Sequence, residues 1–367
     1  MATKAYLVLE DGTVYEGEHF GADTTSYGEV VFDTSMAGYQ EMLTDPSFAG
    51  QLLLLTYPLV GNYGINAVDD ESPNVQARGL IVREHCQTPS HYQSVETLDA
   101  YLKRHGIPGI AGLDTRALTR KLRSSGVMMG LLTATMEPDQ ALAELHSLPA
   151  YADLALAHEV GTDTETVATS SASGQSLHVV LVDCGVKRSI ITHLSSVGCH
   201  VTVVPVTVTA DRIRQLSPDG VLISPGPGDP VHLGGLEAEM RKVMGTVPVM
   251  GICLGHQVIA RALGATTFKL KFGHHGGNHP VKDVATGRVY ITTQNHGYAV
   301  AADSLPDGLE VSHINLNDQT VEGLKHRDFP LISIQYHAEG TPGPRDSAYL
   351  FREFVRLMQN RPARGLN

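Results

Sequence analysis

The residues with the clearest chemical potential lie in the stretch Gly251-Ile252-Cys253-Leu254-Gly255-His256. A short apolar run precedes it and predicts a buried strand over 247–250, and apolar residues at helical spacing follow over 257–263. Cys253 therefore lies on a strand-to-helix turn, as the serine does in a G-x-S-x-G nucleophile elbow. The glycines let backbone segments approach closely, and the helix start directs its N–H groups and positive dipole end at the sulfur. This setting favours the reactive thiolate and predicts a nucleophile rather than a buried structural cysteine.

A cysteine nucleophile needs a base, and the base needs an orienting group. His337-Ala338-Glu339 follows an apolar strand predicted over 329–336. Residues i and i+2 of an extended chain project to the same side, so Glu339 can orient His337. The same letters also fit a solvated loop, because the chain has 18 histidines. The position after a strand, together with the elbow, favours the catalytic interpretation.

An acyl-transfer site also needs N–H donors for the oxyanion that forms during the reaction. The N–H of Leu254 comes directly after the nucleophile, and Gly226 in Pro225-Gly226-Pro227-Gly228 can supply a second donor. A Gly-x-Gly pair fits an ordinary turn equally well. Because no Gly-Lys-Ser/Thr follows it, this loop is not a nucleotide phosphate loop.

Two further polar segments invite a functional interpretation. Residues 272–279 (FGHHGGNH) contain three histidines, but no cysteine or carboxylate completes a zinc-like set, so they predict a glycine-rich structural loop and no metal site. Residues 294–298 (QNHGY) end a strand with polar groups. They fit contacts to a polar substrate, and they also fit a simple turn.

The elements that position these residues follow a regular pattern from residue 177 onward. Strands are predicted over 177–183, 199–206 and 220–224, and helices over 187–197, 211–216 and 236–244. This alternation predicts a parallel sheet with helices on both faces, with ligands at the carboxyl ends of the strands. Gly226 and Cys253 both follow strands and can therefore share one crevice. The later strands (289–293, 309–314, 320–325 and 329–336) predict an antiparallel edge, and a helix is predicted over 349–358.

The first half of the chain mixes strands and helices without a nucleotide or metal motif. An Asp11-Gly12 turn predicts a hairpin of residues 4–9 and 13–16. Strands over 30–32, 51–57 and 79–82, a loop or short helix over 34–47, and helices over 97–105 and 115–125 predict an α/β or α+β domain. A Ser/Thr/Gly-rich break then predicts a linker. The α/β chain is thus expected to form an N-terminal domain over 1–155, a linker over 156–176 and a second domain over 177–361.

Composition sets the broad class of the protein. A length of 367 residues favours two domains, and the net charge of −12 argues against a general nucleic-acid binder. The four cysteines are scattered, which fits neither a disulfide framework nor a zinc ribbon and suits a reducing cytosol. An early carboxylate argues against a signal peptide, and the apolar runs are too short to span a membrane. We therefore expect a soluble cytoplasmic protein without nucleic-acid or membrane partners.

These residues resemble a known family. The stretch 251–257, with His337 and Glu339, resembles the class I (triad) glutamine amidotransferases. The likeness extends over essentially the whole chain to the small subunits of glutamine-dependent carbamoyl-phosphate synthases. It rests on residues 35–41 (SMAGYQE), 44–47 (TDPS), 271–281 (KFGHHGGNHPV), 294–298 (QNHGY) and 342–344 (PGP). The N-terminal half makes the resemblance specific, because other class I amidotransferases lack it.

The resemblance implies a role for each residue of the site. Cys253 would attack the side-chain amide of L-glutamine and form a glutamyl thioester, His337 would move the protons, and Glu339 would orient His337. Gly226 and Leu254 would donate to the oxyanion. The implied glutamine contacts are Ser47, Gly226, Gly228, Leu254, Gln257, Asn295, Gly297 and Tyr298. The contribution of Ser47 would place the substrate near the N-terminal domain.

The resemblance also implies a partner. Ammonia would pass through a tunnel to a large subunit that uses ATP, bicarbonate and magnesium to make carbamoyl phosphate for arginine and pyrimidine synthesis. This chain would hold no cofactor of its own and would form a heterodimer or a higher oligomer with the large subunit.

The sequence departs from the family at a few positions and leaves other functions open. Ala338 replaces a proline, Gly340-Thr341 replaces Ala-Ser, and Pro225 replaces an asparagine that is common there. One alternative is a glutaminase for another acceptor, as in anthranilate or GMP synthesis, against which residues 1–150 argue. The other is a non-catalytic regulatory scaffold, against which the presence of Cys253 and His337 argues.

Overall fold

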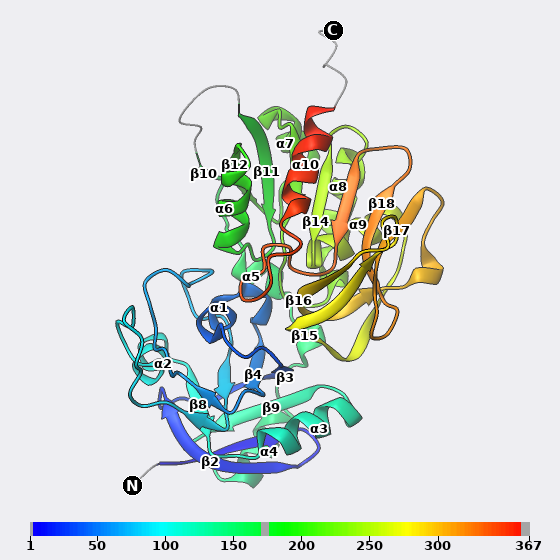
Figure 1. Cartoon of the computed structure of the whole chain (residues 1–367). Helices are drawn as coiled ribbons and strands as arrows, with labels where there is room; N and C mark the ends of the chain where they lie inside the picture. Colours follow the sequence, from blue (N-terminus) through cyan, green and yellow to red (C-terminus); the bar gives the residue numbers. More distant parts are fainter. Residues whose placement is uncertain (1–2, 170–175, 361–367) are drawn as a thin grey trace. The chain divides into compact units, whose positions relative to one another are not determined.

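The computed structural model of the chain describes residues 3–169 and 176–360 and divides into two compact units. The first unit comprises Met1–Leu156 together with Leu270–Gly277, and the second comprises Ala157–Lys269 together with Asn278–Asn367. Figure 1 shows the elements of both. The first unit ends one residue after the N-terminal domain expected from the sequence, and it also takes in a short segment from the second half of the chain.

The first unit is built on a closed barrel. Its strands follow one another in the order β1-β2-β8-β6-β4-β3-β9, with parallel pairs between β3 and β4, β4 and β6, and β6 and β8. The predicted hairpin is confirmed, because β1 and β2 pair antiparallel around the Asp11-Gly12 turn. The strands are β1 (Lys4–Leu9), β2 (Val14–Gly21), β3 (Ser26–Asp33), β4 (Gln51–Leu55), β6 (Gly79–Ile81), β8 (Pro108–Ala111) and β9 (Met128–Thr133), and β5 (Leu59–Val60) pairs separately with β7 (Glu84–His85).

Alternating apolar residues give the barrel separate inner and outer clusters. Leu52 and Leu54 of β4 join one cluster with residues of five other barrel strands, whereas Leu53 and Leu55 join another. Because side chains alternate across a strand, one strand can serve both faces. The helices of this unit are α1 (Tyr39–Thr44), α2 (Leu98–His105), α3 (Thr115–Ser125) and α4 (Pro138–Leu145), with 3-10 turns η1 (Pro46–Phe48) and η2 (Tyr151–Asp153).

The second unit contains a sheet in the order β10-β12-β11-β13-β14-β19-β18-β17-β15-β16. The pairs from β12 to β19 are parallel, which confirms the predicted parallel sheet. One part of the prediction was wrong: β19 lies beside β14 in the parallel region, and the antiparallel edge begins only at β18. The strands are β10 (Thr166–Thr169), β11 (Leu177–Asp183), β12 (Cys199–Pro205), β13 (Gly220–Ile223), β14 (Val249–Ile252), β15 (Thr267–Asp283), β16 (Val289–Val300), β17 (Leu309–Asn315), β18 (Val321–His326) and β19 (Leu331–Ile334).

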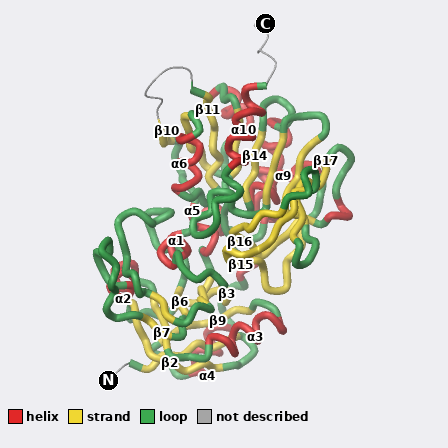
Figure 2. Tube along the Cα trace, in the orientation of Figure 1, coloured by secondary structure: helices red, strands yellow, loops and turns green. Residues whose placement is uncertain are grey.

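Helices cover both faces of the parallel region, as Figure 2 shows. α6 and α10 pack on one face, where Val179 and Leu181 of β11 point. α7, α8 and α9 pack on the other face, against Val180 and Val182. The helices are α5 (Leu156–Val160), α6 (Arg188–Ser196), α7 (Ala210–Leu216), α8 (Gly234–Val243), α9 (Leu254–Leu263) and α10 (Tyr349–Gln359), with 3-10 turns η3 (Pro230–Leu233) and η4 (Ala302–Ser304).

Two segments expected to be irregular form secondary structure instead. Within the expected linker, α5 forms at its start and β10 pairs antiparallel with β12; residues 170–175 lie outside the described part of the chain. The expected glycine-rich loop over 272–279 lies inside β15. Both β10 and β15 form through hydrogen bonds between backbone groups. Such bonds do not require large apolar side chains, and glycine can make them as well.

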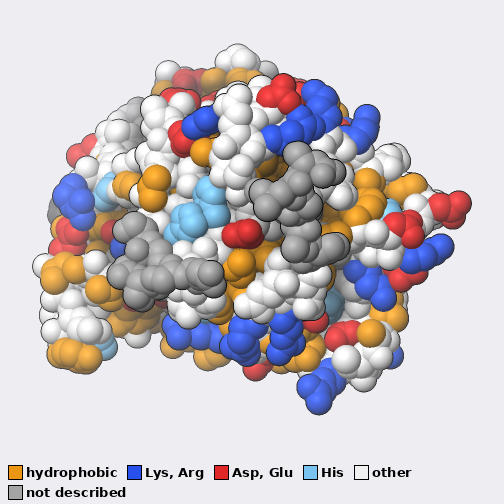
Figure 3. Space-filling model, turned by 90° about the horizontal axis from the view of Figure 1, so that it is seen from above, with side chains coloured by type: hydrophobic (Ala, Val, Ile, Leu, Met, Phe, Trp, Pro, Cys, Tyr) orange, Lys and Arg blue, Asp and Glu red, His pale blue; other side chains and the backbone are white. Residues whose placement is uncertain are grey.

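The surface carries no sign of a membrane segment within residues 3–169 and 176–360, where no helix combines the length and apolarity needed to cross a bilayer. Figure 3 shows one face of the molecule, on which acidic, basic and hydrophobic side chains are interspersed.

Candidate active site

Cys253 occupies the turn between β14 and α9 with an unusual backbone. Its φ is 52° and its ψ is −106°, a region that residues other than glycine rarely adopt and that costs about 1–3 kcal/mol. The strain is held in place on both sides: the Cys253 N–H donates to the Ile334 carbonyl at 2.8 Å, and the Gly255 N–H donates to the Ser224 carbonyl at 3.2 Å. The side chain is buried. The sequence expectation of a sharp strand-to-helix turn is confirmed.

The two flanking glycines are needed for space rather than for backbone conformation. A Cβ on Gly255 would lie 2.2 Å from the Ile223 carbonyl oxygen, and a Cβ on Gly251 would lie 2.5 Å from a side-chain carbon of Ile259. Neither glycine has a positive φ; that conformation falls on Cys253 itself. The glycines thus let α9 pack closely against β13 and β14, and the thiol is presented at the carboxyl end of the parallel strands.

His337 and Glu339 form a buried pair just after β19. Nδ1 of His337 lies 2.6 Å from Oε1 of Glu339, and both side chains are inaccessible to solvent. The backbone N–H of His337 donates to the Thr293 carbonyl at 2.9 Å, which ties this segment to β16. Because Nδ1 faces the carboxylate, Nε2 is the ring nitrogen left to act, and it has no hydrogen-bond partner among the described residues.

The electrostatics of this pair also involve Cys253. Burial opposes a charged imidazole, but the negative charge of Glu339, the nearby Cys253 thiol and the hydrogen bond with Glu339 outweigh it and raise the pKa of His337 to about 10. Burial likewise opposes an ionised Glu339, but the positive charges of Lys187 and His337 hold the pKa of its carboxyl well below the usual value. The site therefore stabilises an ionised Glu339 beside a protonated His337.

Lys187 is a member of this site that the sequence analysis missed. Its Nζ lies 3.0 Å from Oε1 of Glu339 and also donates to the Thr341 carbonyl, and the side chain is buried. Lys187 precedes α6 in the loop after β11, at the carboxyl edge of the parallel strands. Its position four residues after the end of a buried parallel strand is the one signal in the sequence that could have identified it.

The proposed oxyanion donors lie next to each other. A Cβ on Gly226 would lie 2.9 Å from a side-chain carbon of Leu254 and 2.1 Å from the Cys184 carbonyl oxygen, so the loop after β13 packs directly on the elbow. The N–H of Leu254 is the first of α9 and has no acceptor within the helix. Gly228, with φ of 89°, turns the loop in a conformation that favours glycine. Gly226, Gly228 and Leu254 are therefore gathered at one edge of the sheet.

The remaining expected glutamine contacts of the second unit are Gln257, Asn295, Gly297 and Tyr298. The Cys253 Sγ lies 3.6 Å from the Asn295 carbonyl oxygen. Gln257 donates through Nε2 to the Tyr298 carbonyl at 2.8 Å and to Gln335 at 3.1 Å, so its amide already links α9 to β16 and to the segment after β19. A Cβ on Gly297 would meet nothing within 4 Å, so its backbone faces open space.

Two neighbours of these contacts were not expected from the sequence. Gln335 approaches the thiol, with its Nε2 3.7 Å from Sγ of Cys253. His296 has Nδ1 2.8 Å from the Tyr298 carbonyl and Nε2 2.8 Å from Oε1 of Gln294. Both neighbours are oxygen atoms, and the two contacts hold the His296 ring within the strand that carries Asn295.

Ser47 is the one expected contact that lies in the first unit. It is buried in η1, its N–H donates to Asp45 at 2.8 Å, and its Oγ has no hydrogen-bond partner among the described residues. A buried hydroxyl without a partner is costly, and a ligand that bonded it would remove that cost. The participation of Ser47 in glutamine binding stays a prediction.

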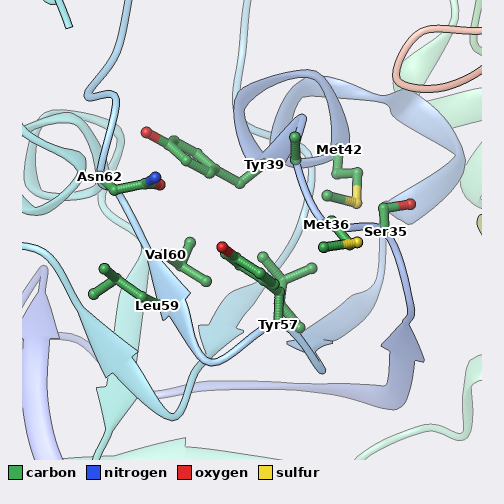
Figure 4. A pocket seen from close by; sticks show the side chains of 10 residues that line it. Ser35, Met36, Tyr39, Met42, Tyr57, Leu59, Val60 and Asn62 are labelled. Carbon is green, nitrogen blue, oxygen red and sulfur yellow. The ribbon is translucent and has the colours of Figure 1, made fainter.

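A small pocket in the first unit is distinct from these residues. Figure 4 shows it, and its volume of about 10 Å³ is only enough for a water molecule. Its lining is mainly apolar or aromatic and consists of Ser35, Met36, Ala37, Tyr39, Met42, Leu55, Tyr57, Leu59, Val60 and Asn62. No cysteine, histidine or carboxylate is among these residues, so the pocket has no group suited to acyl transfer.

The segment that holds His274, His275 and His279 does not form the loop expected for it, and His274 and His275 are buried within β15. The expectation that the chain binds no metal there stays a prediction.

Comparison with known proteins assigns the family of both parts of the chain. Residues 180–357 match the family described as glutamine amidotransferase class-I, and residues 7–132 match the family described as carbamoyl-phosphate synthase small chain, CPSase domain. The second match begins and ends within the first unit.

Whole-chain relatives agree with these matches. The carbamoyl phosphate synthase small chain of Fusobacterium nucleatum is 50% identical over 356 residues, covering 96% of this chain and 98% of the relative. That of Archaeoglobus fulgidus is 49% identical, covering 97% and 99%, and that of a Listeria monocytogenes strain is 50% identical, covering 98% of each. With its elbow cysteine and buried His–Glu pair in an amidotransferase domain, the chain belongs to the carbamoyl-phosphate synthase small chains, a family of glutamine amidotransferases.

Proposed function

We propose that this chain hydrolyses L-glutamine to glutamate and ammonia and delivers the ammonia to an ATP-using large chain. The observation that supports this most strongly is the buried group of Cys253, His337 and Glu339, in a chain that is about as long as the small chains it resembles. The raised pKa of His337 suits it to take the thiol proton, and the resulting thiolate is the nucleophile.

The first half of the reaction breaks the carbon–nitrogen bond. The Cys253 thiolate attacks the side-chain amide carbon, and the N–H groups of Gly226 and Leu254 donate to the oxygen that gains negative charge. Collapse of this intermediate expels nitrogen, which takes the proton from His337 and leaves as ammonia. A glutamyl thioester remains on Cys253.

The second half returns the enzyme to its starting state. His337 takes a proton from a water molecule, which attacks the thioester carbonyl and forms a second oxyanion. The carbon–sulfur bond then breaks, glutamate leaves, and the sulfur recovers its proton from His337. Glu339 keeps His337 in one orientation and stabilises its charged form throughout, while Lys187 balances the buried charge of Glu339.

The role of the partner follows from the family. We propose that the large chain holds the ATP, bicarbonate and magnesium, that this chain holds no cofactor, and that the product, carbamoyl phosphate, serves arginine and pyrimidine synthesis. A heterodimer is the smallest assembly that fits this division. The four free cysteines, among which no disulfide forms, fit a reducing cytoplasmic location.

Replacing Cys253 by serine tests the mechanism. In the assembled enzyme, Cys253→Ser should abolish carbamoyl phosphate synthesis from glutamine while synthesis from added ammonia continues. The assays should follow glutamate release and carbamoyl phosphate formation with each nitrogen source. Glutamine-dependent turnover that stays at the wild-type rate would refute the mechanism.

A further inference from the structure

Gln335 lies beside the nucleophile at the carboxyl edge of the parallel strands. β14 and β19 pair in parallel, and Ile252 opposite Ile334 is the last pair of their register. Cys253 and Gln335 follow these two residues directly, so the register brings both to the same edge of the sheet. The Gln335 N–H donates to the Glu322 carbonyl of β18 at 2.9 Å, and its side chain is completely buried. The fold therefore holds an amide group next to the thiol.

A short series of hydrogen bonds fixes the direction in which the Gln335 amide points. It starts at the backbone carbonyl of Tyr298, which can only accept, and to which Gln257 donates through Nε2 at 2.8 Å. This contact identifies the Gln257 nitrogen, which also donates to Oε1 of Gln335 at 3.1 Å. Turning the Gln335 amide over would place two NH₂ groups against each other. Its Nε2 therefore points the other way, where it lies 3.7 Å from Sγ of Cys253.

The sulfur is the partner of this amide nitrogen. Within residues 3–169 and 176–360, Sγ of Cys253 is the one acceptor that Nε2 of Gln335 meets. A buried NH₂ group without an acceptor is costly, so the contact matters to the amide as well as to the sulfur. A thiol sulfur accepts only weakly, whereas hydrogen bonds to an ionised acceptor are about twice as strong as bonds to a neutral one. The Gln335 amide is thus better satisfied by a thiolate than by a thiol.

A second polar neighbour of the sulfur favours the opposite protonation state. The Asn295 carbonyl oxygen lies 3.6 Å from Sγ of Cys253 and can accept a proton but cannot donate one. It suits the thiol, whose S–H can donate to it, and its partial negative charge repels a thiolate. Of these two neighbours, Gln335 alone stabilises the nucleophilic form of Cys253.

We propose that Gln335 is a further catalytic residue, which donates a hydrogen bond from Nε2 to the Cys253 thiolate. This inference rests on the proposed function, in which that thiolate attacks the glutamine side chain. Once His337 has taken the thiol proton, the sulfur has no proton to share with Asn295 and accepts from Gln335 instead. When the carbon–sulfur bond forms, the charge moves from the sulfur to the oxyanion and the bond to Gln335 weakens again. Gln335 therefore acts on the formation of the thiolate and not on the later steps.

A purely structural role for Gln335 is the competing explanation. Its Oε1 accepts from Gln257, so Gln335 also braces α9 against the segment after β19. Loss of this brace would change how the Gln257 side chain lies, but it would leave the charge on the sulfur unaffected. Gln257→Met removes the same bond from the other side and keeps the Gln335 amide beside the sulfur. A comparison of Gln335→Met with Gln257→Met therefore separates the two roles.

The test measures the thiolate itself in the full-length chain. The ultraviolet absorbance of a thiolate is recorded against pH, and subtracting the same titration after Cys253→Ala isolates Cys253 from the other three cysteines. We expect Gln335→Met to move the midpoint of this titration up by about one pH unit, which is about a tenfold change in the ionisation equilibrium. Gln257→Met should move it by less than about 0.3 unit. Gln51→Met, which removes a buried glutamine amide of the first unit, should leave the midpoint where it is.

The kinetics of glutamine hydrolysis give an independent measurement. In Gln335→Met, kcat/KM for glutamine should fall about tenfold on the acidic limb of its pH profile. The loss should shrink as the pH rises, because the thiol then ionises without the amide. In Gln257→Met the acidic limb should stay in place whatever the change in KM, because the donor to the sulfur remains.

Each result supports or overturns the assignment. Thermal unfolding shows whether a variant is folded, and Gln335→Leu, which also lacks the donor, takes the place of Gln335→Met if that variant does not fold. A titration midpoint equal to that of wild type would overturn the role of Gln335, as would equal shifts in Gln335→Met and Gln257→Met. Absence of glutamine hydrolysis by the wild-type chain assembled with the large chain would instead refute the proposed function, and the titration would still decide whether Gln335 stabilises the thiolate.

Discussion

Lys187→Met tests how the buried charges support the candidate site. The change keeps an unbranched side chain of similar length and removes the ammonium group beside Glu339. At the 3.0 Å separation of Nζ and Oε1, an effective dielectric constant of about 20 gives an attraction of about 5 kcal/mol. Desolvation offsets part of this in the intact pair, but the variant leaves an uncompensated buried carboxylate. We expect a loss of about 3–5 kcal/mol in the free energy of unfolding.

The same change should alter the pH dependence of catalysis. With Lys187 present, the pKa of Glu339 is below its usual value, so ionised Glu339 stabilises the fold above the unfolded pKa and this contribution is lost as the pH falls through the folded pKa. Without Lys187, burial is opposed only by His337 and a backbone hydrogen bond, and the pKa of Glu339 rises. The acidic limb of the kcat/KM profile for glutamine should therefore move to higher pH.

The measurements are thermal unfolding and glutamine hydrolysis between about pH 5 and 9. A loss of this size should lower the unfolding midpoint by about 10 °C for a domain of roughly 200 residues. Lys242→Met on α8 is the matched control, because the Lys242 side chain is exposed and solvent screens its ion pair with Glu239, which should contribute little to stability. If Lys187→Met and Lys242→Met gave equal midpoints and the acidic limb did not move, the reasoning about the buried pair would be refuted.

Two further predictions concern stability. Gly255→Ala should destabilise the protein by about 3 kcal/mol or more, because its Cβ would lie 2.2 Å from the Ile223 carbonyl oxygen. The control is Gly235→Ala in α8, which should be neutral or slightly stabilising because a Cβ there meets nothing within 4 Å. Chemical denaturation would compare the free energies of unfolding of the two variants. Burial and nearby His313 lower the pKa of His256 to about 3. The contribution of neutral His256 to stability is therefore complete above about pH 6.5. It decreases by up to about 1.4 kcal/mol per pH unit as the pH falls towards 3. His256→Asn should lose less stability than wild type between about pH 6.5 and 5, and an equal loss in both proteins would contradict this.

The sequence was sufficient for the elements whose signals are local. The apolar run before Cys253 and the helical spacing after it identified the elbow, and the alternation of strands and helices from residue 177 predicted the parallel sheet. Glu339 was assigned to orient His337 because i and i+2 share a side of an extended chain, and the two side chains do meet at 2.6 Å. These features depend on neighbouring residues, which a sequence displays directly.

Features that depend on distant pairing were not predictable in this way. Lys187 meets Glu339 only because β11 and β19 end at the same edge of the sheet. Closure of the barrel requires β9 to pair with both β1 and β3, and no local pattern encodes that. The assignment of positive φ to Cys253 rather than to its glycines is a property of the folded turn. Each of these emerges from contacts between segments far apart in the chain.

The course of β15 has a practical consequence for dissecting this protein. Residues 270–277 belong to the first unit although the rest of the strand belongs to the second. Phe272 stacks on Phe32 with ring centroids 6.0 Å apart, and the Lys271 carbonyl bonds the Val127 N–H. A fragment cut after Leu156 would therefore lack part of its own barrel packing. The segments of the two units alternate along the chain. Separating the units therefore calls for a circular permutation or for grafting residues 270–277 onto the first unit, because simple truncation would yield an incomplete fold.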